Sequence, residues 1–261
     1  MADYLEVAEA RGRRGMRLAI SAGFPGPWGE AAKAIYRLKS IPFAMVRQVV
    51  GQPNDELFAW TGHRNAPVAV WDDERPRVHW ADILVQAERL APEPSLVPAD
   101  PEARVRMFGL AHELCGEEGL GWTRRHELLV DMQEGASAPG APEAYRETFR
   151  GLASRYAWSA EATPRMRQKS FEIVSLLAAQ LDAQRRAGRR YLLGDALSAL
   201  DVYWATFALL IDPLPDAQCP IDPTLRASYA RCEPRVREAA AGLLAHRDFV
   251  YREHLGLPLD F

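Results

Sequence analysis

A proline-rich stretch divides this chain into two parts of different character. The ten residues from Ala91 to Asp100 hold three prolines, which make a stiff and extended segment. Short apolar runs and turn signals alternate before this segment, whereas helical patterns alone follow it. We therefore expect a linker over residues 92–100, a first domain over residues 16–91 and a second domain over residues 101–261.

Strand and helix signals alternate in the part before the linker. The apolar run from Arg17 to Ser21 ends in a Gly-Pro turn, which is typical of a strand. Pro27 then begins a run with one apolar face, and proline suits a first helical turn because its missing N–H would be unpaired there. The order predicts a parallel strand pair joined by a helix, and an antiparallel edge. The expected strands lie at 17–21, 43–50, 67–71 and 77–79, and the expected helices begin at 27, 56 and 81.

Composition and charge argue against several classes of protein. The 261 residues carry 32 Lys+Arg and 35 Asp+Glu, for a formal net charge of -3. This balance argues against a protein that binds nucleic acid by neutralising phosphates, and against a polybasic protein of membrane surfaces. Residues 1–15 lack the apolar core of a signal peptide, and we expect them to form a flexible leader. Three cysteines without a C-x-x-C pair predict a reducing, cytoplasmic location.

The part after the linker carries one strong local signal, from Ser198 to Asp201. These residues fit a capping box, in which the Ser198 side chain accepts from the N–H of Asp201 and the Asp201 carboxylate reaches back to the N–H of Ser198. Leu197 and Val202 flank the box as a hydrophobic staple, so a helix is expected to begin here. The expected helices lie at 101–131 (broken near Gly116, Gly119 and Gly121), 142–158, 164–186, 198–212 and 234–245.

Together these features resemble the glutathione transferase superfamily. The matching segments are Leu18–Ser21 with Gly26–Trp28, Asn65–Val70, Trp80–Ile83, Leu96–Arg104 and Tyr191–Asp201. The resemblance implies an α/β plus all-α fold, with a thioredoxin-like N-terminal domain of order β-α-β-α-β-β-α followed by an all-helical C-terminal domain. It also implies glutathione as a co-substrate, a small electrophile as the second substrate, and a homodimer.

The resemblance further implies a residue that contacts the glutathione sulfur, and here this sequence departs from the family. The family places Ser, Cys or Tyr near the start of the first helix, whereas the matching residue is Gly26, before Pro27. One interpretation is that the backbone N–H groups of Trp28 and Gly29 hold the sulfur, because a helix N-terminus favours an anion. Ser21, at the end of the first strand, is a second candidate donor. The alternative is a plain tight turn into a helix.

Other positions are implied for the remainder of glutathione. In the family, the residue before a cis-proline pairs its backbone with the cysteinyl part, which implies this role for Ala66 beside Pro67. Where the family has an acidic residue and then serine for the γ-glutamyl end, this sequence has His79 and Trp80. A histidine can meet a carboxylate and an indole N–H can donate. The alternative is that His79 ends an edge strand and Trp80 packs between the domains.

The resemblance also implies that the pocket for the electrophile borders the helical stretch with Cys115, Trp122 and Arg125. His112 and Cys115 are spaced i, i+3 on one face, but zinc needs three or four ligands, so we expect no metal. Cys115 has an alternative role as a small core residue. The apolar tail at 255–261 is expected to fold back over a groove of the helical domain, as a cover for the pocket or by plain packing.

Two functions remain open at this point. The first is a transferase that binds glutathione or a related thiol and conjugates or reduces a small apolar electrophile. The second is a non-catalytic member of the same fold that binds a ligand or another protein, and the departures at Gly26 and at His79 and Trp80 favour it. Neither nucleic acid nor a membrane is expected as a partner.

Overall fold

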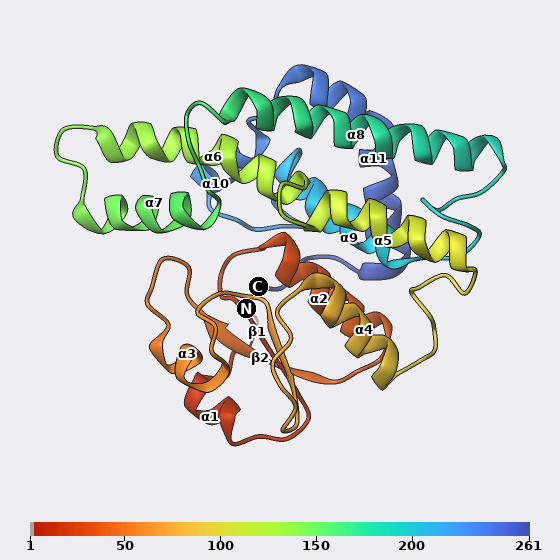
Figure 1. Ribbon diagram of the computed structural model, residues 1–261, viewed down its shortest axis with the longest axis horizontal. Helices are drawn as coiled ribbons and strands as arrows, with labels where there is room; N and C mark the ends of the chain where they lie inside the picture. Colours follow the sequence, from red (N-terminus) through yellow and green to blue (C-terminus); the bar gives the residue numbers. More distant parts are fainter. Residues whose placement is uncertain (1–2) are drawn as a thin grey trace.

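The computed structural model describes residues 3–261. The chain forms two parts that lie side by side: a small sheet with its own helices, and a larger group of helices (Figure 1). The sheet part contains, in order, α1 (Val7–Arg11), β1 (Met16–Ser21), α2 (Pro27–Leu38), β2 (Phe43–Gln48), α3 (Asp55–Thr61), β3 (Val68–Trp71) and α4 (Trp80–Leu90). The helical part contains α5 (Pro101–Cys115), α6 (Leu120–Ser137), α7 (Glu143–Arg155), α8 (Thr163–Arg186), α9 (Ala199–Phe207), α10 (Pro223–Ala230) and α11 (Pro234–Val250), with the short turns η1 (Ala208–Leu210) and η2 (Tyr251–Leu255). This arrangement has the predicted fold class, a thioredoxin-like part followed by an all-helical part.

The sheet has the predicted mixture of directions, with β1 in its centre. β1 pairs in parallel with β2, so that Ser21 lies opposite Gln48, and it pairs antiparallel with β3. The predicted fourth strand at 77–79 is reduced to a single bridge between Arg77 and Ala69. Pro76 offers no N–H before this bridge, and α4 begins at Trp80 directly after it, so there is no room for a longer strand.

The segment expected as a flexible leader is packed from residue 4 onwards, while residues 1 and 2 lie outside the described residues. Leu5 forms a parallel bridge to Val46, and its N–H donates to the carbonyl oxygen of Met45 at 2.9 Å. The short helix α1 then buries Val7 and Ala10 in a small core with the far face of the sheet. This segment therefore extends the sheet beyond β2.

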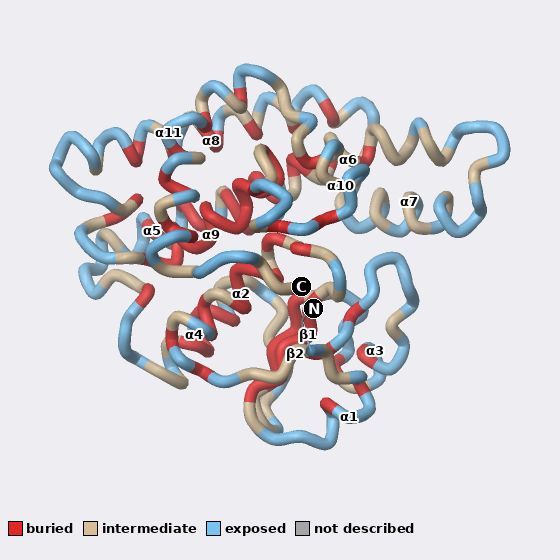
Figure 2. The backbone as a smooth tube through the Cα atoms, turned by 180° about the vertical axis from the view of Figure 1, so that it is seen from behind, coloured by how far each residue is buried: buried red, intermediate tan, exposed pale blue. Residues whose placement is uncertain are grey.

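Helix α2 joins the two parts of the molecule. Ala31, Ile35 and Tyr36 are buried, because the apolar positions of α2 recur at helical spacing. One continuous apolar core runs from Leu18 in β1 through α2 to Leu243 in α11. Figure 2 shows this core as buried backbone along β1, α2 and α9. The division into two domains at residues 92–100 stays a prediction, since the two parts share this core.

Among the helices after the linker, α5 and α6 are separated where the sequence predicts a break. A Cβ on Gly119 would approach the carbonyl oxygen of Glu113 to 2.8 Å, so only glycine fits this turn. Helices α6 and α7 then form a hairpin whose far end projects from the molecule (Figure 1). No helix within residues 3–261 is long and apolar enough to cross a membrane.

The start of α9 is built around the carboxylate of Asp201. It accepts from the backbone N–H of Ser198 at 2.9 Å, from the Ser198 hydroxyl at 2.9 Å and from the N–H of Leu192 at 2.8 Å. His246 of α11 contacts the same carboxylate at 2.8 Å. Asp201 is fully buried, so these contacts fix the loop before α9 and join it to α11.

Candidate functional site

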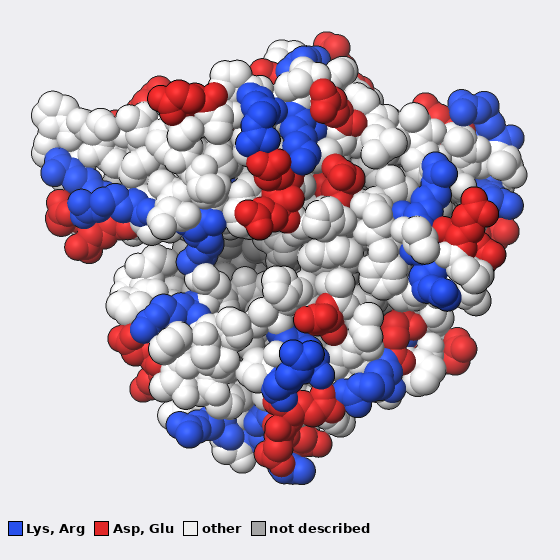
Figure 3. Space-filling model, in the orientation of Figure 1, with Lys and Arg blue, Asp and Glu red and all other residues white. Residues whose placement is uncertain are grey.

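A cavity of about 590 Å³ lies between the two parts of the molecule, at the C-terminal ends of β1 and β2. The N-terminus of α2 forms one wall, and helices α6, α7 and α10 form the opposite walls. Figure 3 shows a hollow between the two parts on one face of the molecule, with basic side chains on its rim. The residues that line the cavity and enter the argument below are Ser21, Phe24, Gly26, Trp28, Gly29, Glu30, Gln48, Ala66, Arg125, Leu128, Asp131, Met132, Tyr145, Leu152, Arg155, Tyr156, Asp222 and Arg231.

The predicted sulfur position, Gly26, lies on this cavity and begins α2. Its φ and ψ are -66° and 125°, an ordinary extended conformation, and its carbonyl oxygen accepts from the N–H of Glu30 at 2.9 Å. Pro27 occupies the first helical position and has no N–H. The N–H groups of Trp28 and Gly29 have no acceptor among the described residues, and both residues line the cavity. Two free donors at a helix N-terminus are therefore available to an anion in the cavity.

Ser21, the second candidate donor, also lines the cavity, but its hydroxyl hydrogen is already used. It donates to the side-chain oxygen of Gln48 at 2.8 Å. The buried Gln48 amide donates in turn to the carbonyl oxygen of Val49 at 3.1 Å. No motif in the sequence singles out Gln48, which lies opposite Ser21 because of the parallel register between β1 and β2.

The side chain of Trp28 contacts the helical part of the protein. Its indole N–H donates to the carbonyl oxygen of Cys115 at 2.8 Å, and its ring meets that of Phe207 edge-on, with centroids 4.9 Å apart. A Cβ on Gly121 would lie 2.6 Å from the Trp28 ring, so glycine is required where α6 passes this tryptophan. Trp28 thus lines the cavity, and its side chain fixes α2 against α5, α6 and α9.

Cys115 and Trp122 lie outside the cavity, so the structure does not bring them together with Arg125 as a substrate pocket. Cys115 is buried, and burial raises the pKa of its thiol well above the usual value, so the thiol stays protonated and unreactive. Trp122 packs edge-on against Tyr156, with ring centroids 4.9 Å apart, and donates to the Tyr156 carbonyl oxygen at 3.1 Å. It therefore supports the cavity residue Tyr156 from behind.

Of the residues predicted to hold the remainder of glutathione, only Ala66 lines the cavity. The Ala66–Pro67 peptide bond is cis. His79 precedes the first residue of α4 and is exposed, and its side chain makes no capping hydrogen bond. Trp80 packs edge-on against Tyr203 of α9, with centroids 5.4 Å apart. The structure thus agrees with the alternative in which Trp80 packs between the two parts.

A buried ion pair lies on α2, and one of its two members, Glu30, lines the cavity. Lys33 contacts the Glu30 carboxylate at 2.9 Å, and both side chains are less than 5% exposed. Burial raises the pKa of Glu30, although the charge of Lys33 opposes this shift. Lys33 also contacts Asp260 of the C-terminal tail at 3.1 Å.

The tail folds back over α2 and contacts Lys33 and Arg37, which do not line the main cavity. Arg37 holds the Asp260 carboxylate through two hydrogen bonds of 2.9 and 2.6 Å, and the N–H of Leu259 donates to the Gln218 carbonyl oxygen at 2.8 Å. Burial alone would raise the pKa of Asp260, but the hydrogen bonds and charges of Arg37 and Lys33 lower it to about 2. The tail borders a separate cavity of about 340 Å³, and no residue after Arg231 lines the main cavity.

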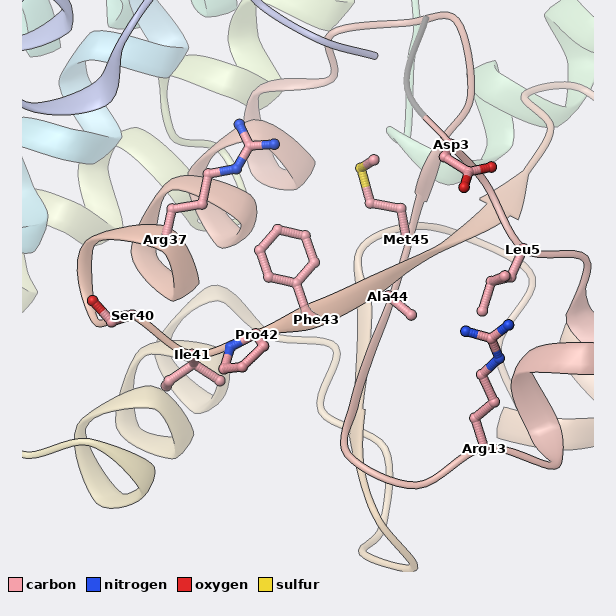
Figure 4. A pocket seen from close by; sticks show the side chains of 10 residues that line it. All are labelled: Asp3, Leu5, Arg13, Arg37, Ser40, Ile41, Pro42, Phe43, Ala44 and Met45. Carbon is pink, nitrogen blue, oxygen red and sulfur yellow. The ribbon is translucent and has the colours of Figure 1, made fainter.

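A third hollow, of about 630 Å³, is open to solvent at the edge of β2. Figure 4 shows Phe43 and Met45 in this hollow, with Arg37 and Arg13 at its two ends. It lies on the opposite end of α2 from Gly26 and holds no residue that the sequence singles out for chemistry.

Comparisons with known proteins show that the chain has a known fold. No protein-family profile and no curated protein matches the sequence. Solved structures do match. Rice GST1 in complex with glutathione has a TM-score of 0.61 at 18% identity, over 94% of this chain and 93% of that chain. The beta-etherase LigF from Sphingobium sp. strain SYK-6 has a TM-score of 0.56 at 19% identity, over 87% of this chain and 99% of that chain.

A glutathione S-transferase from Methylobacterium radiotolerans, in complex with glutathione sulfonate, has a TM-score of 0.54 at 18% identity, over 94% of this chain and 97% of that chain. These three likenesses extend through both the sheet part and the helical part. The identities are low, so what they show is the architecture. The chain has the fold of the glutathione S-transferases.

Proposed function

We propose that this protein is a glutathione-dependent transferase that joins the glutathione sulfur to a small electrophile in the cavity at the N-terminus of α2. Three observations support the proposal: the fold, the position of the cavity between the two parts, and the free donors at its wall. The observation that carries it is a pair of N–H groups that have no acceptor among the described residues and belong to Trp28 and Gly29, two residues that line the cavity. The rice protein and the Methylobacterium protein, which share this fold, hold glutathione and glutathione sulfonate.

In the proposed reaction, backbone N–H groups donate to the glutathione sulfur in place of the side chain that Gly26 lacks. The two N–H groups and the positive end of the α2 dipole stabilise the thiolate, the nucleophilic form of the thiol. The thiol proton passes to solvent. The sulfur then forms a bond to the electrophilic carbon, and the leaving group departs with the electron pair of the bond that breaks. In this proposal, the backbone of Ala66, a residue that lines the cavity beside the cis bond to Pro67, pairs with the cysteinyl part of glutathione.

A second function has specific support, namely a non-catalytic protein of this fold that binds a ligand. Gly26 offers no hydroxyl to the sulfur, and Trp80 packs against Tyr203 where the family has a residue that binds glutathione. In this case, the cavity would bind a small molecule without a thiol partner.

Calorimetry distinguishes the two functions. Glutathione and S-methylglutathione are titrated into the protein at pH 6 and at pH 8.5. The proposed transferase binds glutathione more tightly at the higher pH, because the thiolate is the preferred form, whereas S-methylglutathione shows no such gain. Absence of heat with millimolar glutathione at both pH values rejects the transferase and leaves the ligand-binding protein.

A homodimer is part of the same proposal, with the sheet part of one chain against α5 and α6 of the other. Closed two-fold dimers are the commonest soluble assemblies. Light scattering is expected to give twice the chain mass of 29.2 kDa at micromolar concentration, and the mass of one chain would reject the dimer. The cytoplasmic location stays a prediction from the cysteine count.

A further inference from the structure

The cavity holds a cation that has no carboxylate partner among residues 3–261. Arg125 of α6 lines the cavity, and one of its guanidinium nitrogens lies 3.3 Å from the hydroxyl of Tyr229. Its guanidinium carbon lies 5.5 Å from the ring centroid of Phe24 and 5.6 Å from that of Tyr229. Burial raises the pKa of Tyr229, so this neighbour stays neutral near pH 7. The positive charge of Arg125 is therefore surrounded by aromatic rings and a neutral hydroxyl.

The carboxylates that line the same cavity are each held by other groups. Glu30 pairs with Lys33 at 2.9 Å, and Asp131 pairs with Arg231. Asp222 accepts from two backbone N–H groups at the start of α10. These groups are thus engaged, whereas Arg125 is free to bind an anion from outside the chain.

Arg125 also lies close to the proposed sulfur position. Phe24, whose ring packs on the guanidinium, precedes Gly26 by two residues, and a Cβ on Gly26 would lie 3.7 Å from that ring. One aromatic ring thus separates the guanidinium from the start of α2. A ligand with a negative group on Arg125 would place its next few atoms near the N–H groups of Trp28 and Gly29.

The rest of the cavity favours an aromatic body for this ligand. Tyr145, Leu152 and Tyr156 supply flat and apolar walls, together with Leu128 and Met132. Arg155 of α7, at the rim, donates to the side chain of Asn65 and adds a second positive charge that pairs with no carboxylate among the described residues. Guanidinium groups bind planar carboxylates through two parallel hydrogen bonds.

We propose that the electrophile of this protein is an aromatic compound that carries a carboxylate, and that Arg125 binds this carboxylate. The proposal rests on the transferase function above, because it assigns the second substrate of that reaction. Glutathione also carries carboxylates, so the test must distinguish a carboxylate of the electrophile from a carboxylate of glutathione at Arg125.

The test uses a matched pair of electrophiles, 4-chloro-3-nitrobenzoate and 4-chloro-3-nitrobenzamide, with glutathione and the full-length protein. The native protein is expected to show the higher kcat/KM with the benzoate. Arg125→Met is expected to lower kcat/KM for the benzoate by about 10- to 100-fold, the loss that corresponds to a charge-assisted hydrogen bond, and to change the benzamide little. Arg165→Met serves as the control for loss of one positive charge, because Arg165 is exposed on α8, pairs with Glu118 and does not line the cavity.

A second measurement does not depend on glutathione. Calorimetry with 3-nitrobenzoate alone is expected to detect binding to the native protein and to Arg165→Met, and weaker binding to Arg125→Met. If this pattern appears but glutathione neither binds nor reacts, the anion site stands and the transferase function fails. Equal binding of 3-nitrobenzoate to the native protein and to Arg125→Met overturns the anion site.

A loss of glutathione affinity in Arg125→Met, without a change in the benzoate-to-benzamide ratio, assigns the arginine to glutathione and also overturns the proposal. Arg125→Lys keeps the charge and is expected to retain part of the benzoate preference. If circular dichroism shows that neither variant folds, the comparison of the two electrophiles in the native protein tests the proposal. Equal kcat/KM for the benzoate and the benzamide then overturns it.

Discussion

Replacement of Gly26 by serine tests whether the backbone alone holds the thiolate. The φ and ψ of -66° and 125° suit any L-residue, and the new Cβ would meet only the Phe24 ring, at an ordinary contact distance of 3.7 Å. Serine is also a preferred residue at a helix N-cap. Gly26→Ser is therefore expected to fold and to place a hydroxyl beside the two N–H groups.

The expected shift in the pKa of the bound thiol follows from the hydrogen-bond donors that the native protein and the serine variant each offer to the sulfur. A partly buried helix terminus stabilises an anion by up to about 2 kcal/mol, so the native protein is expected to lower the thiol pKa by about one unit from its ordinary value of about 8.5. A hydrogen bond from a hydroxyl to the charged sulfur adds about 1.5–3 kcal/mol, which lowers the pKa by roughly one to two further units. At pH 6.5 the serine variant should then hold several times more thiolate and react correspondingly faster with a generic aryl halide.

The assay is ultraviolet titration of the thiolate of bound glutathione in the native protein, Gly26→Ser and Gly26→Ala. The alanine variant adds the Cβ without the hydroxyl and is expected to match the native pKa. A native pKa already lowered by two or more units would refute the reasoning. Ser21→Ala would then show whether the Ser21 hydroxyl, which donates to Gln48 in this structure, turns to the sulfur instead.

Three further predictions concern the surroundings of the site. Lys33→Met leaves the Glu30 carboxylate buried without its partner, so denaturant unfolding should show a loss of about 3–5 kcal/mol, and a loss below about 1 kcal/mol would mean that water reaches Glu30. Gly121→Ala would force a Cβ to within 2.6 Å of the Trp28 ring and should cost about 1–3 kcal/mol, whereas Gly109→Ala in α5, where a Cβ meets nothing within 4 Å, should be neutral or slightly stabilising. The pKa of Asp260 is lowered from 3.8 to about 2, so its contribution to stability is present above about pH 4 and is lost as the pH falls towards 2. The melting temperature of Asp260→Asn should therefore lie below that of the native protein at pH 7 and meet it near pH 2, and a constant difference across this range would reject the charge pairing.

Much of the fold follows from local patterns in the sequence. The run from Arg17 to Ser21, the proline that begins α2 and the glycine-rich break after Cys115 each act over a few residues. The start of α9 is partly local as well, because the Asp201 carboxylate accepts from the N–H of Ser198, three residues before it. Such signals predict elements and their ends, and the alternation of strand and helix then leaves few topologies to choose from.

The residues that line the cavity are harder to predict from the sequence, because they depend on which face of each helix packs against which neighbour. The sequence predicts Cys115 and Arg125 on one helical stretch, but the break at Gly119 separates α5 from α6, and only Arg125 lines the cavity. The contact of Asp260 with Lys33 joins residues far apart in the sequence. No local pattern in either segment indicates that the other lies beside it.

The family resemblance puts His79 and Trp80 at a helix start, and α4 begins at Trp80, but the sequence does not show what this helix start faces. Tyr203 of α9 occupies the space beside the Trp80 ring, and this is a property of the packing between the two parts. The departure at Gly26 is different, because a missing side chain is visible in the sequence itself. Its consequence, two free N–H groups at the cavity, became clear only with the backbone geometry of α2.

A crystal structure of the full-length protein with glutathione tests the proposed role of α2 most directly. The sulfur is expected within hydrogen-bonding distance of the N–H groups of Trp28 and Gly29, with the cysteinyl backbone beside Ala66 and the Ser21 hydroxyl still bonded to Gln48. A sulfur held by the Ser21 hydroxyl, or a cavity that stays free of glutathione at saturating concentration, would contradict the proposal that this backbone binds the thiolate.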